Sequence, residues 1–566
     1  MRMSLKSVWF LAFTAVFAVL AGFVFWGTWS MDVAPVMPDH PTTHAADSVA
    51  RFLNGWLANG KFVPGDVIAF LGSPYFWQEL KYVLSLYCAA LGLAYFCRGR
   101  GLPSVASYGA GLLLAFSGYW MTLFSAGHYG WFQWMTYGVF AFGLVDRAVA
   151  GNRLRHWLLL GAVVAWASFY QQDLWLFFTV FTAAYFVFRC ISERAFPWKG
   201  VLVSALAFAL IGLPSFRDAF ANSLKGREEQ LSQGQTLSKK DASEADKRWE
   251  FVTNWSMPPE DTAEFLIPGV HGDTSCPFVL SIGRRLASGV MPYEGRLGRP
   301  MNAPSGNYRQ HSLYLGAIFC LFALLGVISG IRGLFNPPNA QSKNLSISQS
   351  LNPSIPQSNN RTIEQSNILT ILFFSVAALV FYLLSLGRFF EPAYRLVFAL
   401  PFGDMIRCPV KWHHLTEFCL AVLAGFGIAW ALSLVERLGS VGRYAPWIVG
   451  GLVFLGAFDL ARVDRRYCAP VDVSEARRTN SSANLTFLPR QQFQNPQVAE
   501  MVRQRKIVSV ANYVGNPDVF LVSVVQPFGP DKPPVRSTAA ILLGLLSLAA
   551  SLGVIGFAVR SRMTEN

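Results

Sequence analysis

One pattern recurs along the whole chain: an apolar run of about helical length, bounded by charged residues, Gly or Pro. A bilayer core about 30 Å thick needs roughly 20 apolar residues per helix, and a backbone in lipid satisfies its polar groups within such a run only as a helix. About twelve runs are present. They lie at residues 8–28, 80–97, 105–124, 131–150, 157–170, 174–190, 201–213, 312–331, 369–386, 415–434, 447–460 and 539–559. The sequence therefore predicts an all-α polytopic membrane protein with about twelve transmembrane helices.

The composition supports this fold class. Hydrophobic residues make up 53% of the 566 residues and charged residues only 14%, whereas soluble chains carry about a quarter charged residues. The net charge of +14 comes without any nucleic-acid-binding module, so we expect no nucleic-acid partner. Basic residues in the predicted external segments favour contact with anionic lipid headgroups or a lipid-linked phosphate, and a solvated surface is the alternative.

The topology follows from the basic residues of the short loops, which mark the cytoplasmic side. Every second junction carries Lys or Arg, which places both termini in the cytoplasm. The first run is interpreted as a retained anchor, because Trp26 and Trp29 at its end resemble an interfacial belt. The segments predicted to be external are residues 30–77, 214–311, 387–414 and 462–537.

The low-complexity stretch rich in Ser, Asn, Gln and Pro predicts a division of the chain, because it cannot bury enough apolar surface to fold alone. We expect a cytoplasmic linker over residues 335–367 between a membrane block at 1–334 and a second block at 368–461. The external segment 462–537 contains two β-prone runs and predicts a small α+β unit. Residues 538–566 form the final span and a cytoplasmic tail.

The first external loop carries an apolar stripe typical of an amphipathic helix lying on the membrane surface. Either Thr42 or Thr43 is a candidate for its N-cap. Such a helix would hold residues 31–44 over the mouth of the bundle. The stripe is formed by Val49, Phe52, Leu53, Trp56 and Leu57.

Ionisable side chains gather in that loop. Asp39 and Asp32 are candidate general bases toward an acceptor hydroxyl, and ordinary loop capping is the alternative. A divalent metal held by Asp39, His40 and His44 is a further possibility, although Pro41 argues against one continuous helix face.

Other candidate side chains lie at the ends of predicted spans on the same side. His128 and Asp173 are expected to line the same pocket as Asp39, with capping of helix ends at the water interface as the alternative. Arg407 and Lys411 flank a Pro-stiffened turn and are candidates for binding a phosphate, with interfacial anchoring as the alternative. Three cysteines are predicted to be external, and the sequence does not show whether a disulfide joins any two of them. They are Cys276, Cys408 and Cys468.

Several short motifs together resemble one group of proteins. They are the His128 loop, the segment from Trp255 to Glu260 leading to Pro268 and Gly269, the Tyr314-Leu315-Gly316 entry into a span, and the Arg407-Cys408-Pro409 turn. In order and spacing they resemble the YfhO-type bacterial membrane proteins, which are similar to the wider GT-C glycosyltransferase superfamily.

That resemblance implies a multi-pass enzyme of the bacterial inner membrane. It implies transfer of a sugar from a polyprenyl-phosphate donor to a glycan, lipid or protein acceptor on the outer face. The catalytic acid of such enzymes commonly lies in the first external loop, which corresponds here to Asp39 first and Asp32 second. His44, His128, Asp173, Arg407 and Lys411 are then expected to bind substrate.

Two other classes of function stay open. A lipid or glycolipid transporter or flippase would show ionisable residues within spans, broken helices and related halves. The sequence shows almost no charge in the middle of a predicted span and no obvious repeat, which favours the enzyme. The third class is a non-catalytic envelope assembly protein.

Overall fold

A computed structural model provides the structure of this protein. It describes residues 5–27, 33–35, 42–44, 74–126, 132–169, 172–216, 243–271, 312–335, 357–400, 403, 406–468, 470–472, 481–489, 495–504, 507–512, 519–527 and 538–564.

Long apolar helices dominate the described residues. Nine of them are long and apolar enough to cross a membrane, which identifies the chain as a helical membrane protein. These nine are α1 (Leu5–Phe25), α3 (Pro74–Gly99), α8 (Gln172–Glu193), a helix over Trp198–Phe216, α11 (Ala317–Phe335), α12 (Gln357–Ser385), α14 (His413–Glu436), α15 (Ala445–Asp464) and α18 (Thr538–Met563).

The other three predicted spans form helices that are not among these nine. The run at 105–124 is broken into α4 (Ser104–Ala115) and α5 (Gly118–Ala126). The next two runs correspond to α6 (Phe132–Gly151) and α7 (Leu154–Ala167), and α7 is short. A total of twelve crossings therefore stays a prediction.

Helix α14 occupies the centre of the bundle, because it packs against α11, α12 and α4. Its contact with α11 depends on glycine. A Cβ on Gly427 would overlap the carbonyl oxygen of Phe322, and one on Gly326 would overlap that of Leu423. Small residues let helix backbones approach this closely in membranes. Since α4 precedes the predicted linker and α14 follows it, the two predicted blocks form one bundle.

The predicted linker is also shorter than expected. Helix α12 begins at Gln357, inside the stretch assigned to the linker, and the side chains of Ser366 and Asn367 contact other helices. Low-complexity composition predicted no structure there, but packing against the bundle supplies the partners that an isolated segment lacks. Residues 336–356 lie outside the described part of the chain.

The strands join two segments that are far apart in the sequence. Strand β1 (Val33–Pro35) pairs antiparallel with β3 (Pro470–Asp472), and β2 (Thr42–His44) pairs with β4 (Ser481–Pro489). Strand β4 continues into a four-stranded sheet in the order β2-β4-β6-β5, completed by β6 (Val519–Pro527) and β5 (Ile507–Asn512).

These strands correct one prediction and extend another. Thr42 and Thr43 lie in β2, so neither caps a helix at that point; pairing with β4 satisfies their backbone instead. The predicted amphipathic stripe lies outside the described residues. The α+β unit forms in the last segment, where α17 (Pro496–Arg503) accompanies β4, β5 and β6. It recruits strand β2 from the first loop.

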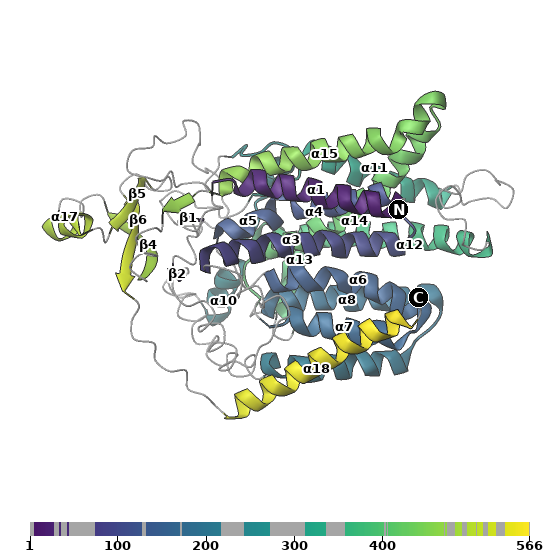
Figure 1. The fold of residues 1–566 in the computed structure, drawn as a ribbon, viewed down its shortest axis with the longest axis horizontal. Helices are drawn as coiled ribbons and strands as arrows, with labels where there is room; N and C mark the ends of the chain where they lie inside the picture. The colour runs from purple at the N-terminus through teal and green to yellow at the C-terminus, as the bar shows by residue number, and fades with distance from the viewer. Residues whose placement is uncertain are drawn as a thin grey trace.

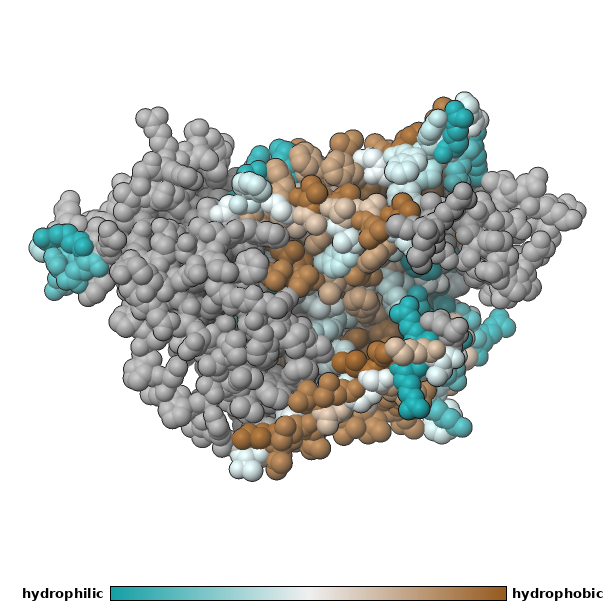
Figure 2. Space-filling view, viewed as in Figure 1, coloured by the Kyte–Doolittle hydropathy of each residue, from teal (hydrophilic) through white to brown (hydrophobic). Residues whose placement is uncertain are grey.

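The bundle has two distinct ends (Figure 1). The first turn of α1 and the last turn of α18 lie together at one end, here named the terminus end, and the strands lie beyond the other end, named the sheet end. Between them, the helices carry exposed apolar side chains such as Leu379, Trp447 and Leu546. Figure 2 shows brown, hydrophobic surface on this middle part of the molecule. Such a belt is what a bilayer requires.

Short elements gather at the sheet end between the long helices. Their backbones are stiffened by proline at several starts. They are α10 (Glu244–Thr253), η3 (Pro259–Phe265), η4 (Gly387–Phe390), α13 (Glu391–Ala399), η6 (Pro409–Trp412) and η8 (Arg465–Tyr467), whereas η7 (Gly439–Tyr444) precedes α15.

Candidate functional site

Backbone hydrogen bonds bring the sequence motifs together at the sheet end. The N–H of Cys408 donates to the carbonyl of Val252 (3.1 Å), and the N–H of Val410 donates to that of Trp255 (3.1 Å). The N–H of Met257 donates to the carbonyl of Ser385 at the end of α12 (2.9 Å). The segment after α10 is therefore held between α12 and the turn before α14.

The entry into α11 joins the same assembly. The N–H groups of Leu315 and Gly316 both donate to the carbonyl of Phe265, at 3.1 and 2.9 Å. Gly316 has φ +77°, a left-handed conformation that glycine adopts without steric cost. Three motifs that lie far apart in the sequence thus meet in one place.

Arg388 and Ser256 join these segments to the end of α12 through hydrogen bonds and an ion pair. The guanidinium of Arg388 lies 3.2 Å from the carboxylate of Glu250 and donates to the carbonyl of Thr253 (3.1 Å). The backbone N–H of Arg388 donates to Ser256 Oγ (3.0 Å). The preceding Gly387 has φ +50°, and a Cβ there would overlap the same oxygen.

The break between α4 and α5 is stabilised by a carboxylate from another helix. A new helix start leaves N–H groups without intrahelical partners. In α5, the N–H of Gly118 donates to the carbonyl of Tyr314 (2.9 Å), and that of Tyr119 donates to Glu417 Oε1 (3.2 Å). Glu417 Oε2 accepts from Ser117 Oγ (3.0 Å). Glu417, on α14, therefore caps α5 from outside.

Two histidines precede Glu417 on the first turn of α14, and both are fully buried. His413 Nε2 lies 3.3 Å from Glu417 Oε1, and the His413 ring packs against Phe265, with centroids 4.9 Å apart. The centroid of the His414 ring lies 4.2 Å from that of the Tyr119 ring. Aromatic packing on this scale fixes the orientation of both imidazoles.

A second carboxylate, Asp464, ends α15 close to Glu417. Its exposed fraction is 1%, and Glu417 is the ionisable group of the described residues that acts on it electrostatically. Asp464 Oδ2 has no hydrogen-bond partner among the described residues. Buried polar atoms normally have partners, so an exception in a native fold calls for a cause.

A third acid lies nearby on α15. The phenol of Tyr314 donates a hydrogen bond to Asp459, whose other oxygen accepts from Arg462 (2.9 Å). Burial and that hydrogen bond raise the pKa of the Tyr314 phenol, because both disfavour the phenolate. This contact ties the start of α11 to α15.

The structure separates the two predicted phosphate ligands. Arg407 is exposed, and its guanidinium lies 5.7 Å from the centre of the Phe251 ring. Lys411 is buried in η6, with an exposed fraction of 6%. Both belong to the same turn at the sheet end, but they occupy different environments.

The other predicted site residues fall wholly or partly outside the described residues. Asp32, Asp39 and His128 are outside them. His44 ends strand β2, where its Cα is paired with that of Ser482, and Asp173 is the second residue of α8. The side chains of both lie outside the described part of the structure.

The structure describes only some of the residues of the predicted metal site and only two of the three cysteines predicted to be external. The described residues contain no group of three or more His, Cys, Asp or Glu placed to hold a metal ion, and His40 lies outside them together with Asp39. Cys408 and Cys468 form no disulfide with another described cysteine. Cys276 is outside the described residues.

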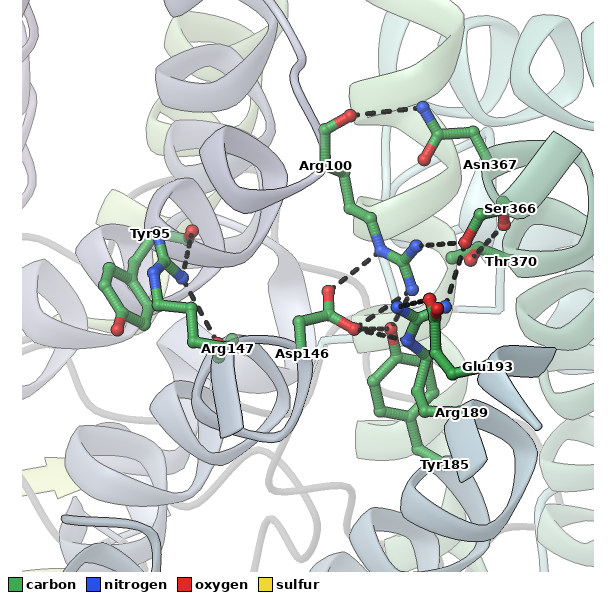
Figure 3. A network of polar contacts seen from close by, with 11 residues as sticks. Tyr95, Arg100, Asp146, Arg147, Tyr185, Arg189, Glu193, Ser366, Asn367 and Thr370 are labelled. Atoms are coloured by element: carbon green, nitrogen blue, oxygen red, sulfur yellow. Dashed lines mark hydrogen bonds and ion pairs between the residues drawn. The ribbon is translucent and has the colours of Figure 1, made fainter. Parts of the chain in front are cut away.

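A second buried polar cluster lies at the terminus end (Figure 3). Asp146 Oδ2 lies 2.8 Å from Arg100 Nε, and Asp146 Oδ1 lies 2.9 Å from Arg189 Nε. Both guanidinium groups also donate to Ser366 Oγ, each at 2.9 Å, and Tyr185 donates to Asp146 (2.8 Å). This network links α3, α6, α8 and α12.

Sequence reasoning missed His413, Glu417 and Asp464. The available signal was the presence of ionisable residues at the ends of apolar runs, which are costly in a membrane and usually functional. Glu417 lies inside the predicted span 415–434, and Asp146 lies inside the span 131–150. Both residues lie toward an end of their runs, so the expectation of almost no charge in the middle of a span stays a prediction.

Comparison with known proteins adds no family to these observations. The chain matches no protein-family model, and neither curated proteins nor solved structures give a match.

Proposed function

We propose that this chain is a membrane glycosyltransferase that moves a sugar from a polyprenyl-phosphate-linked donor to an envelope acceptor on the outer face. The observation that carries the proposal is the convergence of three motifs at the sheet end, next to buried acids and imidazoles. These motifs are the segment after Trp255, the Tyr314 entry and the Cys408 turn. A transferase needs such a place, where acid–base groups meet a lipid-anchored substrate.

The proposal takes the sheet end as the outer side of a bacterial inner membrane. Two features support that orientation. Basic residues such as Arg98, Arg332 and Arg562 end α3, α11 and α18 at the opposite end of the bundle, as the positive-inside rule requires. The strands of the segments between α1 and α3 and between α15 and α18 lie at the sheet end.

In this proposal the first external loop supplies the reacting carboxylate. Asp39, or Asp32, takes the proton of the acceptor hydroxyl while the lipid phosphate leaves, a role that contributes about 10²- to 10⁴-fold. Strand pairing with β3 and β4 holds β1 and β2, which flank Asp39 in the sequence. The exposed Arg407 binds the donor phosphate, assisted by Lys411 of the same turn, which is buried.

The remaining predicted ligands have roles in positioning the sugar and the acceptor. We assign these roles to His44, His128 and Asp173. The backbone of His44 lies in β2, and that of Asp173 lies at the start of α8. The partners of the protein are then the lipid-linked sugar, the surrounding lipids and a glycan, lipid or protein acceptor.

A transporter or flippase of lipids or glycolipids is the second candidate, because one observation favours it. The break between α4 and α5, capped by the buried carboxylate of Glu417, resembles the broken helices of transporters. In such proteins, half-helix ends meet polar groups within the membrane. The buried ionisable residues Asp146 and Arg189 point in the same direction.

The substitution Asp39→Asn separates these functions. An enzyme loses transfer of sugar by at least about 10²-fold but still binds lipid-linked sugar, because the amide keeps the shape and loses the base. A transporter or assembly protein is little affected. The readouts are the glycan and glycolipid profiles of cells carrying each variant, and binding of polyprenyl-phosphate sugars to the purified full chain.

The matched control for Asp39→Asn is Glu500→Gln. Glu500 lies on α17 at the sheet end, its side chain is 49% exposed, and it pairs with Arg503. The same loss of charge there leaves the glycan profile unchanged. Unchanged transfer in Asp39→Asn, with Asp32→Asn equally active, contradicts the enzymatic proposal.

A further inference from the structure

We infer that α15 binds an anionic phospholipid at the sheet end, with Arg462, Arg465 and Arg466 around the phosphate and the acyl chains against the apolar faces of α15 and α1. This lipid site is independent of the proposed function, because the phospholipid binds whether the chain transfers a sugar or moves a lipid. It uses neither Asp39 nor the turn with Arg407.

Helix α15 carries one continuous exposed face along its length. The face starts with Trp447 and continues through Gly451, Leu455 and Phe458 to Arg462, all of which are exposed. Residues three or four apart lie next to one another on the same side of an α-helix. Outward-facing apolar side chains of a membrane helix meet lipid chains. The face is therefore a surface for lipid chains that ends in arginine.

Three arginines follow the apolar part of this face, in the last turn of α15 and in η8, and all three are exposed. Arg462 lies 2.9 Å from Asp459 Oδ1, and a guanidinium group has five N–H donors, so most of its donors stay available. Arg465 and Arg466 pair with no carboxylate of the described residues, and this includes the buried Asp464. The surface therefore carries more positive than negative charge.

The end of α1 completes this surface, because α1 lies beside α15 (Figure 1). The centroids of the Phe23 and Phe458 rings are 5.5 Å apart, and the guanidinium carbon of Arg465 lies 4.7 Å from the centre of the Phe23 ring. This contact places the charge of Arg465 at the junction of the two helices. Trp26 is exposed just after α1, and indole rings gather at the headgroup level of membranes. The arginines and Trp26 thus mark the level of the lipid phosphates.

An anionic phospholipid combines the two features that this surface requires, a negative phosphate and apolar chains attached to it. Guanidinium groups bind phosphate oxygens through charge-assisted hydrogen bonds, which are often bidentate. Inorganic phosphate would meet the arginines but leave the apolar face uncovered. A zwitterionic lipid would bring a cation to a surface that is already positive. The surface therefore favours an anionic phospholipid over both.

Titration of the full chain in detergent with a short-chain phosphatidylglycerol tests the inference, with the unfolding temperature as readout. A ligand that binds only the folded state raises this temperature. The wild type is expected to show a saturable rise. The double variant Arg465→Gln/Arg466→Gln should need at least about 10-fold more lipid for the same rise, because each arginine near a lipid surface adds to binding.

The matched control is Arg443→Gln, on the element that precedes the other end of α15. Arg443 is also exposed and lies over an aromatic ring, with its guanidinium carbon 4.8 Å from the centre of the Tyr444 ring. This variant should keep the wild-type titration. Phosphatidylcholine with the same chains, and inorganic phosphate, should give no saturable rise at these concentrations. The inference is overturned by an equal rise with either compound, by an unchanged titration in the double variant, or by an equal loss in Arg443→Gln.

Cross-linking in the wild type provides a readout that needs no variant to fold. A phosphatidylglycerol with a photoreactive group on its acyl chain is added to the full chain, and the labelled peptides are identified by mass spectrometry. Labels are expected on the peptides that contain Phe23 and Phe458. Labels confined to other helices overturn the inference.

Discussion

The two ends of the bundle differ in how their buried charged groups are paired. At the terminus end, Arg100 and Arg189 meet Asp146 and Glu193, so positive and negative charges balance, and each charged group has an opposite charge within 2.9 Å. At the sheet end, His413 Nε2 lies 3.3 Å from Glu417 Oε1, and the buried Asp464 has one oxygen, Oδ2, with no hydrogen-bond partner among the described residues.

This difference indicates which cluster is structural and which is functional. A buried polar network whose charges are all paired rigidifies a fold and specifies one arrangement of its helices. A cluster that leaves buried atoms without partners costs stability and persists where chemistry uses it. We therefore assign the terminus-end network to the fold and propose that the sheet-end cluster serves the function.

The largest expected effect on stability is at the terminus end. Asp146→Ala removes the carboxylate shared by Arg100 and Arg189, which leaves two buried cations facing each other. Breaking a buried pair in this way costs about 3–5 kcal/mol in the free energy of unfolding. Denaturant or thermal unfolding of the purified protein in detergent measures it. A change below about 1 kcal/mol would show that water reaches this network.

A smaller loss is expected from Ser366→Ala in the same network. Its hydroxyl accepts from both guanidinium groups, so its removal leaves two buried donors unpaired, at a cost of about 1–3 kcal/mol. The matched control is Ser375→Ala, on the same helix, whose hydroxyl only donates to the carbonyl of Ile371. Equal stabilities of the two variants would remove Ser366 from the network.

Tyr314→Phe tests the connection between α11 and α15 at the sheet end. Loss of its hydrogen bond to Asp459 is expected to cost about 1 kcal/mol at neutral pH. Because the pKa of Tyr314 is raised in the fold, its contribution is complete below the unfolded pKa of about 10 and is lost as the pH rises further. Unfolding curves between neutral and alkaline pH should therefore converge for wild type and variant.

The smallest effect is expected for an ion pair on the surface. Glu391 and Arg395 on α13 lie 3.3 Å apart, and their side chains are 53% and 54% exposed. Water and salt screen such a pair, so Glu391→Gln should change the free energy of unfolding by at most about 1 kcal/mol. A loss comparable to that of Asp146→Ala would break the contrast between buried and exposed charge.

The sequence predicted much of the fold because the membrane imposes a simple rule on it. Apolar runs became helices, and the β-prone runs near Ile507 and Val519 became strands. Pairings between distant segments could not be predicted, since β1 and β2 carry no local signal for partners as far along the chain as β3 and β4. The break at Ser117 could not be predicted either, because Glu417 stabilises it from another helix.

The candidate site was predicted only in part. The turn with Arg407 and Lys411 precedes a membrane helix, α14, as expected, but its binding of a phosphate stays a prediction, and burial of Lys411 depends on tertiary packing. Glu417 and Asp464 look ordinary near the ends of their helices. The contacts of Glu417 with Ser117, Tyr119 and His413 depend on the tertiary fold, which the order of residues alone does not give.

The most direct test of the account compares activity with stability in one variant of the first loop and one of the terminus end. We predict that Asp39→Asn keeps the wild-type unfolding temperature and loses sugar transfer by about 10²-fold or more per folded molecule. Ser366→Ala should unfold at a lower temperature and keep full transfer per folded molecule. Full transfer in Asp39→Asn, or an equal loss of transfer in Ser366→Ala, would contradict the account.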